Sequence, residues 1–171
     1  RSDGGYRCCW IESLLGVFED FGYGEVRTPT IEYADVVSRG DEGSAGDAYR
    51  FFDDRGELLA LRTDMTIPIA RLVATRFGEV APPWRLSYIA NSYRAVTPQR
   101  ARLREFGQAG VELIGADGAD CIAEVVEILA RSLDAVGLGD AVIGLGDAEL
   151  WDALVRDLGG SEEVVEASSR R

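Results

Sequence analysis

The sequence predicts an α+β domain in which helices flank a largely antiparallel sheet. Its 171 residues are about the size of one domain. Hydrophobic residues make up 46% and charged residues 28%, which is the composition of an ordinary soluble globular protein. Segments with helical periodicity are mixed with pairs of short strands joined by turns, whereas a strict alternation of strand and helix would predict a parallel sheet.

The first third of the chain is predicted to form a helix, a short strand and a loop. Apolar residues at steps of three and four predict a helix over residues 7–21, which Gly22 ends. A strand is expected over residues 25–28 and ends at Pro29, because proline cannot donate to a strand ladder. Residues 38–47 lack periodicity and hold several glycines and acids, which is typical of a loop.

The middle of the chain is predicted to form a hairpin and a helix. Two short strands are expected over residues 49–53 and 57–62, with Gly56 in the turn between them. A helix is expected over residues 66–77. Pro68 fits its first turn, where the missing N–H removes no intrahelical hydrogen bond.

The rest of the chain is predicted to hold two longer strands, two helices and one short strand. The longer strands cover residues 85–96 and 104–114, with a loop between them. The clearest amphipathic pattern in the chain predicts a helix over residues 122–136, with Asp120 as its N-cap. A strand at 141–145 and a helix at 148–158 are expected to follow.

Composition excludes several kinds of site. The sequence contains no histidine, which excludes Ser-His-Asp catalysis, Cys-His catalysis and histidine-ligated metals. Cys8, Cys9 and Cys121 show no C-x-x-C spacing, so we expect reduced structural thiols and no metal site. The net charge of −12 disfavours nucleic acid as a partner. No apolar run approaches the roughly 20 residues of a membrane span, so a cytoplasmic location is expected.

The strand expected at 104–114 has two different faces. Ala109, Val111 and Leu113 form an apolar face suited to a core. The opposite face carries Arg104, Phe106, Gln108, Gly110 and Glu112. This second face is either solvated or part of a small-molecule pocket. A glycine within a strand often marks the close approach of a ligand or another backbone, which favours the pocket. Its arginine and carboxylate groups would suit a zwitterion.

Three blocks of sequence carry a resemblance to a known family. The first is Glu25-Val26-Arg27-Thr28-Pro29, and the second runs from Leu61 to Arg71. The third comprises Tyr93-Arg94 and the segment from Arg102 to Gly115. Over residues ~10–158 these blocks resemble the class II histidyl-tRNA synthetase catalytic core. The resemblance implies a class II aminoacyl-tRNA synthetase-like fold over residues 1–160, followed by a polar tail at 161–171.

Within that superfamily, the chain is more similar to the regulatory subunits of ATP phosphoribosyltransferase, which are paralogues of the synthetases. The segment Asp64-Met65-Thr66 resembles these paralogues, since synthetases usually carry Glu-Gly-Thr there. Val96 stands where the synthetase pattern has a glutamate that helps to hold ATP, and valine cannot accept a hydrogen bond from an adenine amino group. Nothing matches the third class II motif, so we expect the chain to be a truncated form.

The resemblance implies a non-catalytic regulatory subunit for the first step of histidine biosynthesis and its feedback control. The expected partners are a short-form ATP phosphoribosyltransferase catalytic subunit and L-histidine as effector, with the chain as a homodimer in a hetero-oligomer. No catalytic residue, cofactor, membrane or nucleic acid is expected. One alternative is a fragment of a histidyl-tRNA synthetase core that activates histidine with ATP. Another is a truncated paralogue with a structural role only.

The resemblance also implies which residues bind histidine. They are Asp64, Thr66, Arg94, Arg102, Gln108 and Glu112. Asp64 would contact the amino group, either arginine the carboxylate or a phosphate, and Glu112 with Gln108 the polar end of the ligand. Phe106 and Tyr88 are expected to form walls of the site.

Overall fold

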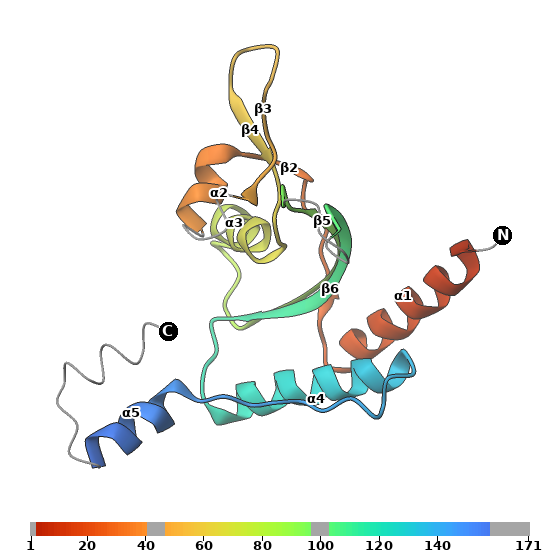
Figure 1. The fold of residues 1–171 in the computed structure, drawn as a ribbon, viewed down its shortest axis with the longest axis vertical. Helices are drawn as coiled ribbons and strands as arrows, with labels where there is room; N and C mark the ends of the chain where they lie inside the picture. The colour runs from red at the N-terminus through yellow and green to blue at the C-terminus, as the bar shows by residue number, and fades with distance from the viewer. Residues whose placement is uncertain (1–2, 41–46, 97–102, 158–171) are drawn as a thin grey trace. The chain divides into compact units, whose positions relative to one another are not determined.

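The computed structural model describes residues 3–40, 47–96 and 103–157 of the chain (Figure 1). The chain divides into two compact units, residues 1–139 and residues 140–171. The elements in chain order are α1 (Asp3–Asp20), β1 (Gly24–Glu25), β2 (Ile31–Tyr33), α2 (Ala34–Gly40), β3 (Arg50–Phe52), β4 (Leu58–Leu61), α3 (Thr66–Arg76), β5 (Trp84–Tyr93), β6 (Glu105–Ile114), α4 (Ala119–Ala135) and α5 (Ala148–Asp157). The first unit is an α+β arrangement, as the sequence predicts.

The larger sheet has the strand order β1-β5-β6, and β5 and β6 form its long antiparallel pair. The two strands pair along their whole length, starting with Trp84 opposite Ile114. This confirms the two longer strands predicted from the sequence. β1 is only two residues long and lies parallel to β5, so the strand expected over 25–28 forms a short parallel edge rather than part of the antiparallel sheet.

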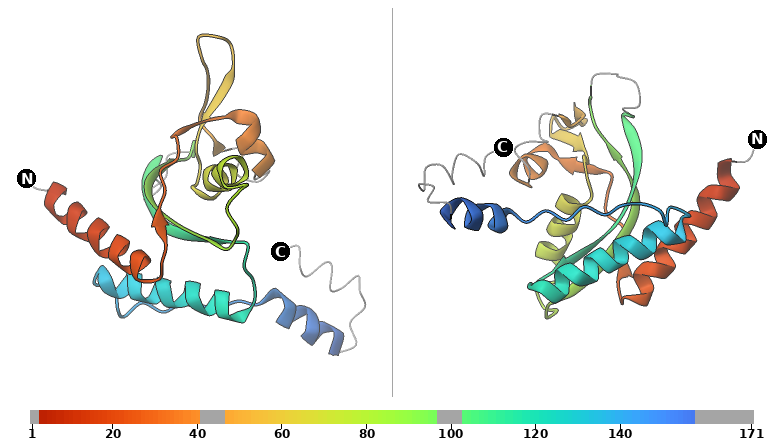
Figure 2. Two further views of the ribbon diagram at one scale, coloured as in Figure 1. Left: turned by 180° about the vertical axis from the view of Figure 1, so that it is seen from behind. Right: turned by 60° about the horizontal axis from the view of Figure 1, so that its bottom comes forward.

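Helices cover both faces of the larger sheet (Figure 1 and Figure 2). α1 and α4 cover one face, where Phe18, Tyr23 and Ile128 are buried and pack against Val111 and Leu113 of β6. Two of the three residues predicted for the apolar face of this strand therefore face the core.

α3 covers the opposite face of the same sheet. Ile69 and Val73 of α3, together with Met65 at its N-terminus, pack against Leu86 and Tyr88 of β5. Residues paired across an antiparallel ladder share a face of the sheet. The residues of β6 opposite Leu86 and Tyr88 therefore also lie on the face that α3 covers.

The smaller sheet has the strand order β2-β4-β3 and is antiparallel. α2 packs on it through a small cluster of buried side chains, Ala34, Val37, Ala48 and Ala60. β3 and β4 form the predicted hairpin, which projects from the rest of the unit (Figure 1). Gly56 has a φ of +83° in its turn, a conformation that glycine adopts without steric cost.

Arg62 joins the smaller sheet to the larger one. It directly follows β4 and is only 6% exposed. Its Nε donates to the carbonyl oxygen of Asn91 on β5 at 2.8 Å, and its Nη1 donates to those of Thr28 at 2.9 Å and Pro29 at 3.2 Å. Burial lowers the pKa of this guanidinium below its ordinary value. The arginine therefore fixes the segment before β2 against β5.

Three predictions about local structure are wrong. Residues 38–40 belong to α2 rather than to a loop, because the helix is stabilised by packing on the smaller sheet. α4 begins after Gly118, whose φ is +95°, so Asp120 lies in the first turn and is not the N-cap. Residues 141–145 form no strand, since a strand needs a hydrogen-bonded neighbour and no strand is described in the unit 140–171.

The second unit contains α5, which confirms the helix predicted at 148–158. Leu150 and Leu154 are exposed on it. The expected tail at 161–171 lies outside the described residues. No described helix is long and apolar enough to cross a membrane.

Candidate ligand-binding site

Five polar or titratable side chains meet between the N-terminus of α3 and the β5–β6 pair, and we name them the α3–β6 cluster. They are Asp64, Thr66, Tyr88, Gln108 and Glu112. Asp64 precedes α3 and Thr66 is its first residue. The other three come from β5 and β6, on the face that α3 covers. Four of the six residues that the sequence predicts for the site are thus brought together, and the polar face of β6 is half-buried at Gln108, Gly110 and Glu112.

Glu112 is the central acceptor of the cluster. Thr66 donates its hydroxyl proton to the Oε1 atom of Glu112 at 2.8 Å, which ties α3 to β6. Burial raises the pKa of Glu112 above its ordinary value, and the nearby negative charge of Asp64 adds to this effect. The Thr66 hydrogen bond opposes the rise because it stabilises the carboxylate.

Asp64 has a structural role at the start of α3. Its Oδ1 atom accepts a hydrogen bond from the backbone N–H of Ile67 at 3.2 Å, and its Oδ2 atom accepts one from the hydroxyl of Thr63 at 3.3 Å. The N-cap residue Met65 has no side chain that can cap the helix. Asp64 therefore satisfies a free N–H group of the first turn, and its negative charge is favourable at a helix N-terminus.

Tyr88 and Gln108 form the second half of the cluster. The Nε2 atom of Gln108 donates to the Tyr88 hydroxyl at 3.3 Å. Tyr88 is 5% exposed, and burial raises its pKa to about 12, with contributions from Glu112 and Asp64.

Gly110 makes room for this tyrosine. A Cβ atom at Gly110 would lie 2.6 Å from the Tyr88 hydroxyl oxygen and 2.8 Å from Cζ. The sequence predicts a close approach at this glycine, by a ligand or another backbone. In the structure it is the side chain opposite it on β5 that approaches.

The chemistry of the cluster suits a ligand with an ammonium group and further polar atoms. In the part of the chain that the structure describes, no ion pair neutralises Asp64 or Glu112. Two carboxylates close to each other in a half-buried site attract a cation. The tyrosine and glutamine next to them supply hydrogen-bond donors for the polar atoms of such a ligand.

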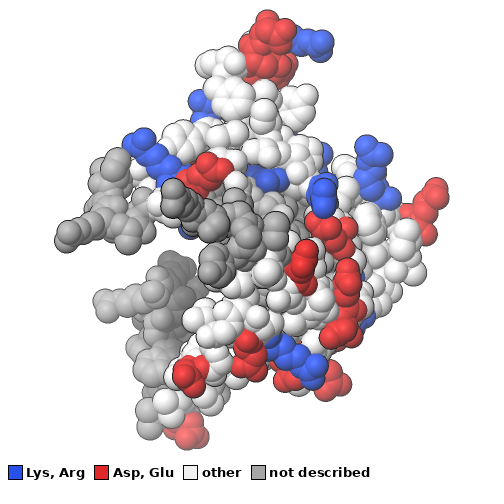
Figure 3. Space-filling model, turned by 90° about the vertical axis from the view of Figure 1, so that its right-hand side faces the viewer, with Lys and Arg blue, Asp and Glu red and all other residues white. Residues whose placement is uncertain are grey.

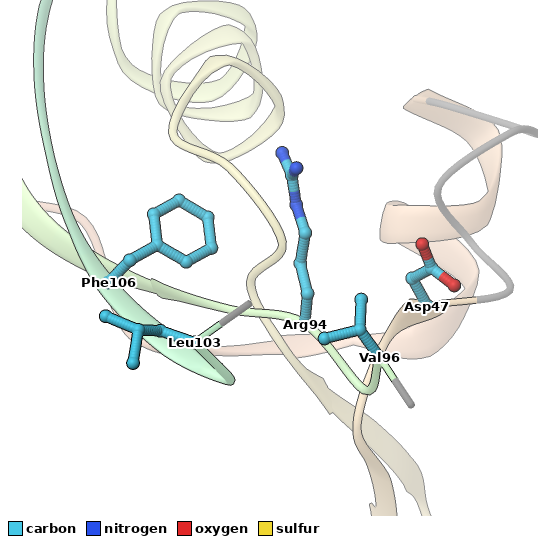
Figure 4. A pocket seen from close by; sticks show the side chains of 5 residues that line it. All are labelled: Asp47, Arg94, Val96, Leu103 and Phe106. Carbon is cyan, nitrogen blue, oxygen red and sulfur yellow. The ribbon is translucent and has the colours of Figure 1, made fainter. Parts of the chain in front are cut away.

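Arg94 faces a different cavity, of about 410 Å³, lined by Asp47, Arg94, Val96, Leu103 and Phe106 (Figure 4). Its guanidinium carbon lies 5.2 Å from the centre of the Phe106 ring, a cation–π contact. Its Nε donates to the carbonyl oxygen of Thr63 at 3.4 Å, so this cavity adjoins the segment that leads into Asp64. Phe106 thus forms a wall beside Arg94, whereas Tyr88 belongs to the α3–β6 cluster.

Arg102 lies outside the described residues. Among the residues that the structure places, no group of three histidine, cysteine or acidic side chains could hold a metal ion.

On the face shown in Figure 3, acidic and basic side chains are interspersed rather than separated by sign.

The prediction from the sequence missed Ser92. Its hydroxyl donates to the Oε1 atom of Gln108 at 3.0 Å, and its side chain is fully buried. The signal was present, because the period of two places Ser92 on the same face of β5 as Tyr88.

Comparison with known proteins identifies the family of the chain and supports its fold class. A family model described as histidyl-tRNA synthetase matches residues 6–170. The crystal structure of an ATP phosphoribosyltransferase regulatory subunit/histidyl-tRNA synthetase from Bacillus halodurans C superimposes with a TM-score of 0.71 at 35% identity, over 78% of this chain and 34% of that one. This agrees with the class II synthetase-like fold expected from the sequence.

Curated relatives carry two different names. An ATP phosphoribosyltransferase regulatory subunit from Desulforamulus reducens is 43% identical over 155 residues, which cover 91% of this chain and 38% of the relative. A histidine–tRNA ligase from Thermococcus kodakarensis is 41% identical over 157 residues, which cover 91% of this chain and 36% of the relative. The chain thus spans well under half the length of each relative.

Proposed function

Because the chain belongs to the histidyl-tRNA synthetase family, we propose that it serves as a non-catalytic regulatory subunit of ATP phosphoribosyltransferase. The observation that carries this proposal is the identity of 43% and 44% to two curated regulatory subunits. In this role the chain is required for the first step of histidine biosynthesis and makes that step sensitive to histidine.

The effector in this proposal is L-histidine, and its site is the α3–β6 cluster. Asp64 and Glu112 would hold its ammonium group and a ring N–H, since both are acceptors without a cationic partner among the described residues. Gln108 and Tyr88 would supply donors for the remaining polar atoms. Arg94 or Arg102 would contact the carboxylate, which requires the ligand to reach from the cluster toward the Arg94 cavity.

The partner is the short-form catalytic subunit, which lies with this chain in the cytoplasm. Regulation requires histidine to bind one assembly state more tightly than another, and a coupling free energy of ~1–3 kcal/mol is typical of such effects. Class II cores pair near their first motif, so the proposed homodimer would form near Pro29.

The position of Val96 favours regulation over catalysis. Val96 lines the Arg94 cavity, the place where the resemblance expects a glutamate to hold ATP. A valine there leaves an adenine amino group without an acceptor, which costs ~1–3 kcal/mol.

The test is the activity of a short-form ATP phosphoribosyltransferase catalytic subunit with and without this chain, titrated with histidine. We expect activity that appears on addition of the chain and falls as histidine is added. Activity that changes neither on addition of the chain nor on addition of histidine would contradict the proposal.

A histidyl-tRNA synthetase core is the alternative function, and the 41% identity to a histidine–tRNA ligase supports it. It requires formation of histidyl adenylate. Exchange of pyrophosphate into ATP that depends on histidine would establish this alternative and exclude a purely regulatory role.

A further inference from the structure

We infer that Ser92 is a positioning residue for the candidate histidine site: it fixes the side-chain amide of Gln108 so that the α3–β6 cluster presents hydrogen-bond donors to the ligand. The inference rests on the proposed function for the identity of the ligand. The hydrogen bonds by which Ser92 fixes Gln108 belong to the chain without any ligand.

The side-chain amide of Gln108 is hydrogen-bonded to two hydroxyl groups, one on each side. Ser92 donates to the oxygen of the Gln108 amide at 3.0 Å, and the nitrogen of the same amide donates to the Tyr88 hydroxyl at 3.3 Å. Ser92 and Tyr88 flank Ala90, which is paired with Gln108 in the β5–β6 register. The small alanine opposite Gln108 and Gly110 opposite Tyr88 leave space for these two long side chains.

The orientation of the amide determines the direction of the neighbouring hydrogen bonds. With its oxygen on Ser92, Gln108 gives one N–H to Tyr88 and keeps a second N–H. The Tyr88 oxygen then acts as acceptor, which leaves the phenolic proton free to donate. With the amide reversed, its oxygen would take the Tyr88 proton, and the cluster would lose that donor.

This arrangement decides which ligand atoms the cluster can accept. Asp64 and Glu112 are acceptors when they are ionised, so the donors at this end of the cluster come from Gln108 and Tyr88. A ligand therefore needs a hydrogen-bond acceptor next to its cationic group. Histidine offers one in the unprotonated nitrogen of a neutral imidazole ring.

The first test compares two buried serines of β5. Ser92→Ala removes the hydroxyl that fixes the amide. Ser87→Ala is the matched control, because Ser87 is 1% exposed, lies on the opposite face of the same strand, and its hydroxyl has no partner among the described residues. We expect calorimetric titration to show about three- to tenfold weaker histidine binding for Ser92→Ala and unchanged binding for Ser87→Ala.

A double-mutant cycle separates positioning from a general loss of stability. In a chain that carries Gln108→Ala, the further change Ser92→Ala should leave histidine affinity unchanged, since the residue through which Ser92 acts is already gone. Independent, additive losses of affinity from the two changes would overturn the inference. Equal losses from Ser92→Ala and Ser87→Ala would overturn it as well.

A measurement without ligand distinguishes failure of the inference from failure of the proposed function. The side-chain NH₂ group of Gln108 can be identified in nitrogen-15 NMR spectra as the pair of signals missing from Gln108→Ala. We expect these protons to exchange with solvent several-fold faster in Ser92→Ala than in the unmodified chain. If their exchange is the same, Ser92 does not fix the amide, whether or not histidine binds. If exchange accelerates but the unmodified chain does not bind histidine, the proposed function fails and the positioning role stands.

Discussion

The close contact between Gly110 and Tyr88 gives a sharp test of how β5 and β6 are paired under α3. Gly110→Ala would place a Cβ atom 2.6 Å from the Tyr88 hydroxyl oxygen and 2.8 Å from its Cζ atom. Both distances are far below the 3.5–4.0 Å of an ordinary contact between nonbonded atoms. The tyrosine cannot simply swing away, because it is 5% exposed and packs against Met65 and Ile69.

The expected cost follows from overpacking of a buried side chain. Inserting a carbon atom into a filled core typically costs about 1–3 kcal/mol, because side chains or backbone must shift. With a urea dependence of about 1–3 kcal/mol per molar, a loss of 2 kcal/mol lowers the midpoint of unfolding by roughly 1 M. Urea unfolding followed by circular dichroism measures this directly.

Gly107→Ala is the matched control on the same strand. A Cβ atom at Gly107 would have no other atom within 4 Å. Alanine within a strand restricts the unfolded chain more than glycine does, so this change should be neutral or stabilise by up to roughly 1 kcal/mol. Equal stability of the two variants would refute the placement of Tyr88 against Gly110.

Three further predictions concern charged groups. Burial raises the pKa of Glu112, so its contribution to stability is fully present below the ordinary pKa of glutamate and is lost as pH rises through the raised value. Glu112→Gln should therefore flatten the dependence of the unfolding free energy on pH, measured by urea titrations from about pH 4 to about pH 7; an unchanged slope would contradict this. Arg62→Met removes a buried donor that bonds three backbone carbonyl groups, including that of Thr28, and should lower the unfolding free energy by on the order of 3 kcal/mol; a loss under about 0.5 kcal/mol, typical of surface changes, would be incompatible with its hydrogen bonds. Burial and a 2.7 Å hydrogen bond to Glu124 raise the pKa of Tyr23, so Glu124→Gln should lower that pKa, as followed by ultraviolet absorbance of the phenolate; an unchanged pKa would show that the charge of Glu124 does not act on Tyr23.

The alternation of residue types along the sequence predicted the strands of the site well. The period of two along residues 104–114 places Gln108, Gly110 and Glu112 on one face, and the β5–β6 register confirms it. The turn at Gly56 and the helix that begins at Thr66 were also predicted, because each depends on residues close in the sequence.

Long-range packing accounts for what the sequence could not predict. Thr66 and Glu112 are 46 positions apart, and only the packing of α3 on the sheet brings them within hydrogen-bond distance. Resemblance to a family suggested that they share a site, but composition and periodicity did not. Arg94 lines a neighbouring cavity and not the α3–β6 cluster itself. The short helix α2 was missed because it is stabilised by the smaller sheet rather than by a strong apolar pattern of its own.

The binding of histidine to the chain and to Glu112→Ala tests the proposed histidine site most directly. Glu127→Ala serves as control, because Glu127 lies on the exposed surface of α4 in an ion pair with Arg131. We expect calorimetry to detect histidine binding to the unmodified chain and to the control, and binding at least tenfold weaker to Glu112→Ala, since a hydrogen bond to a charged group contributes about 1.5–3 kcal/mol. Unchanged histidine affinity in Glu112→Ala would contradict the assignment of the α3–β6 cluster as the histidine site.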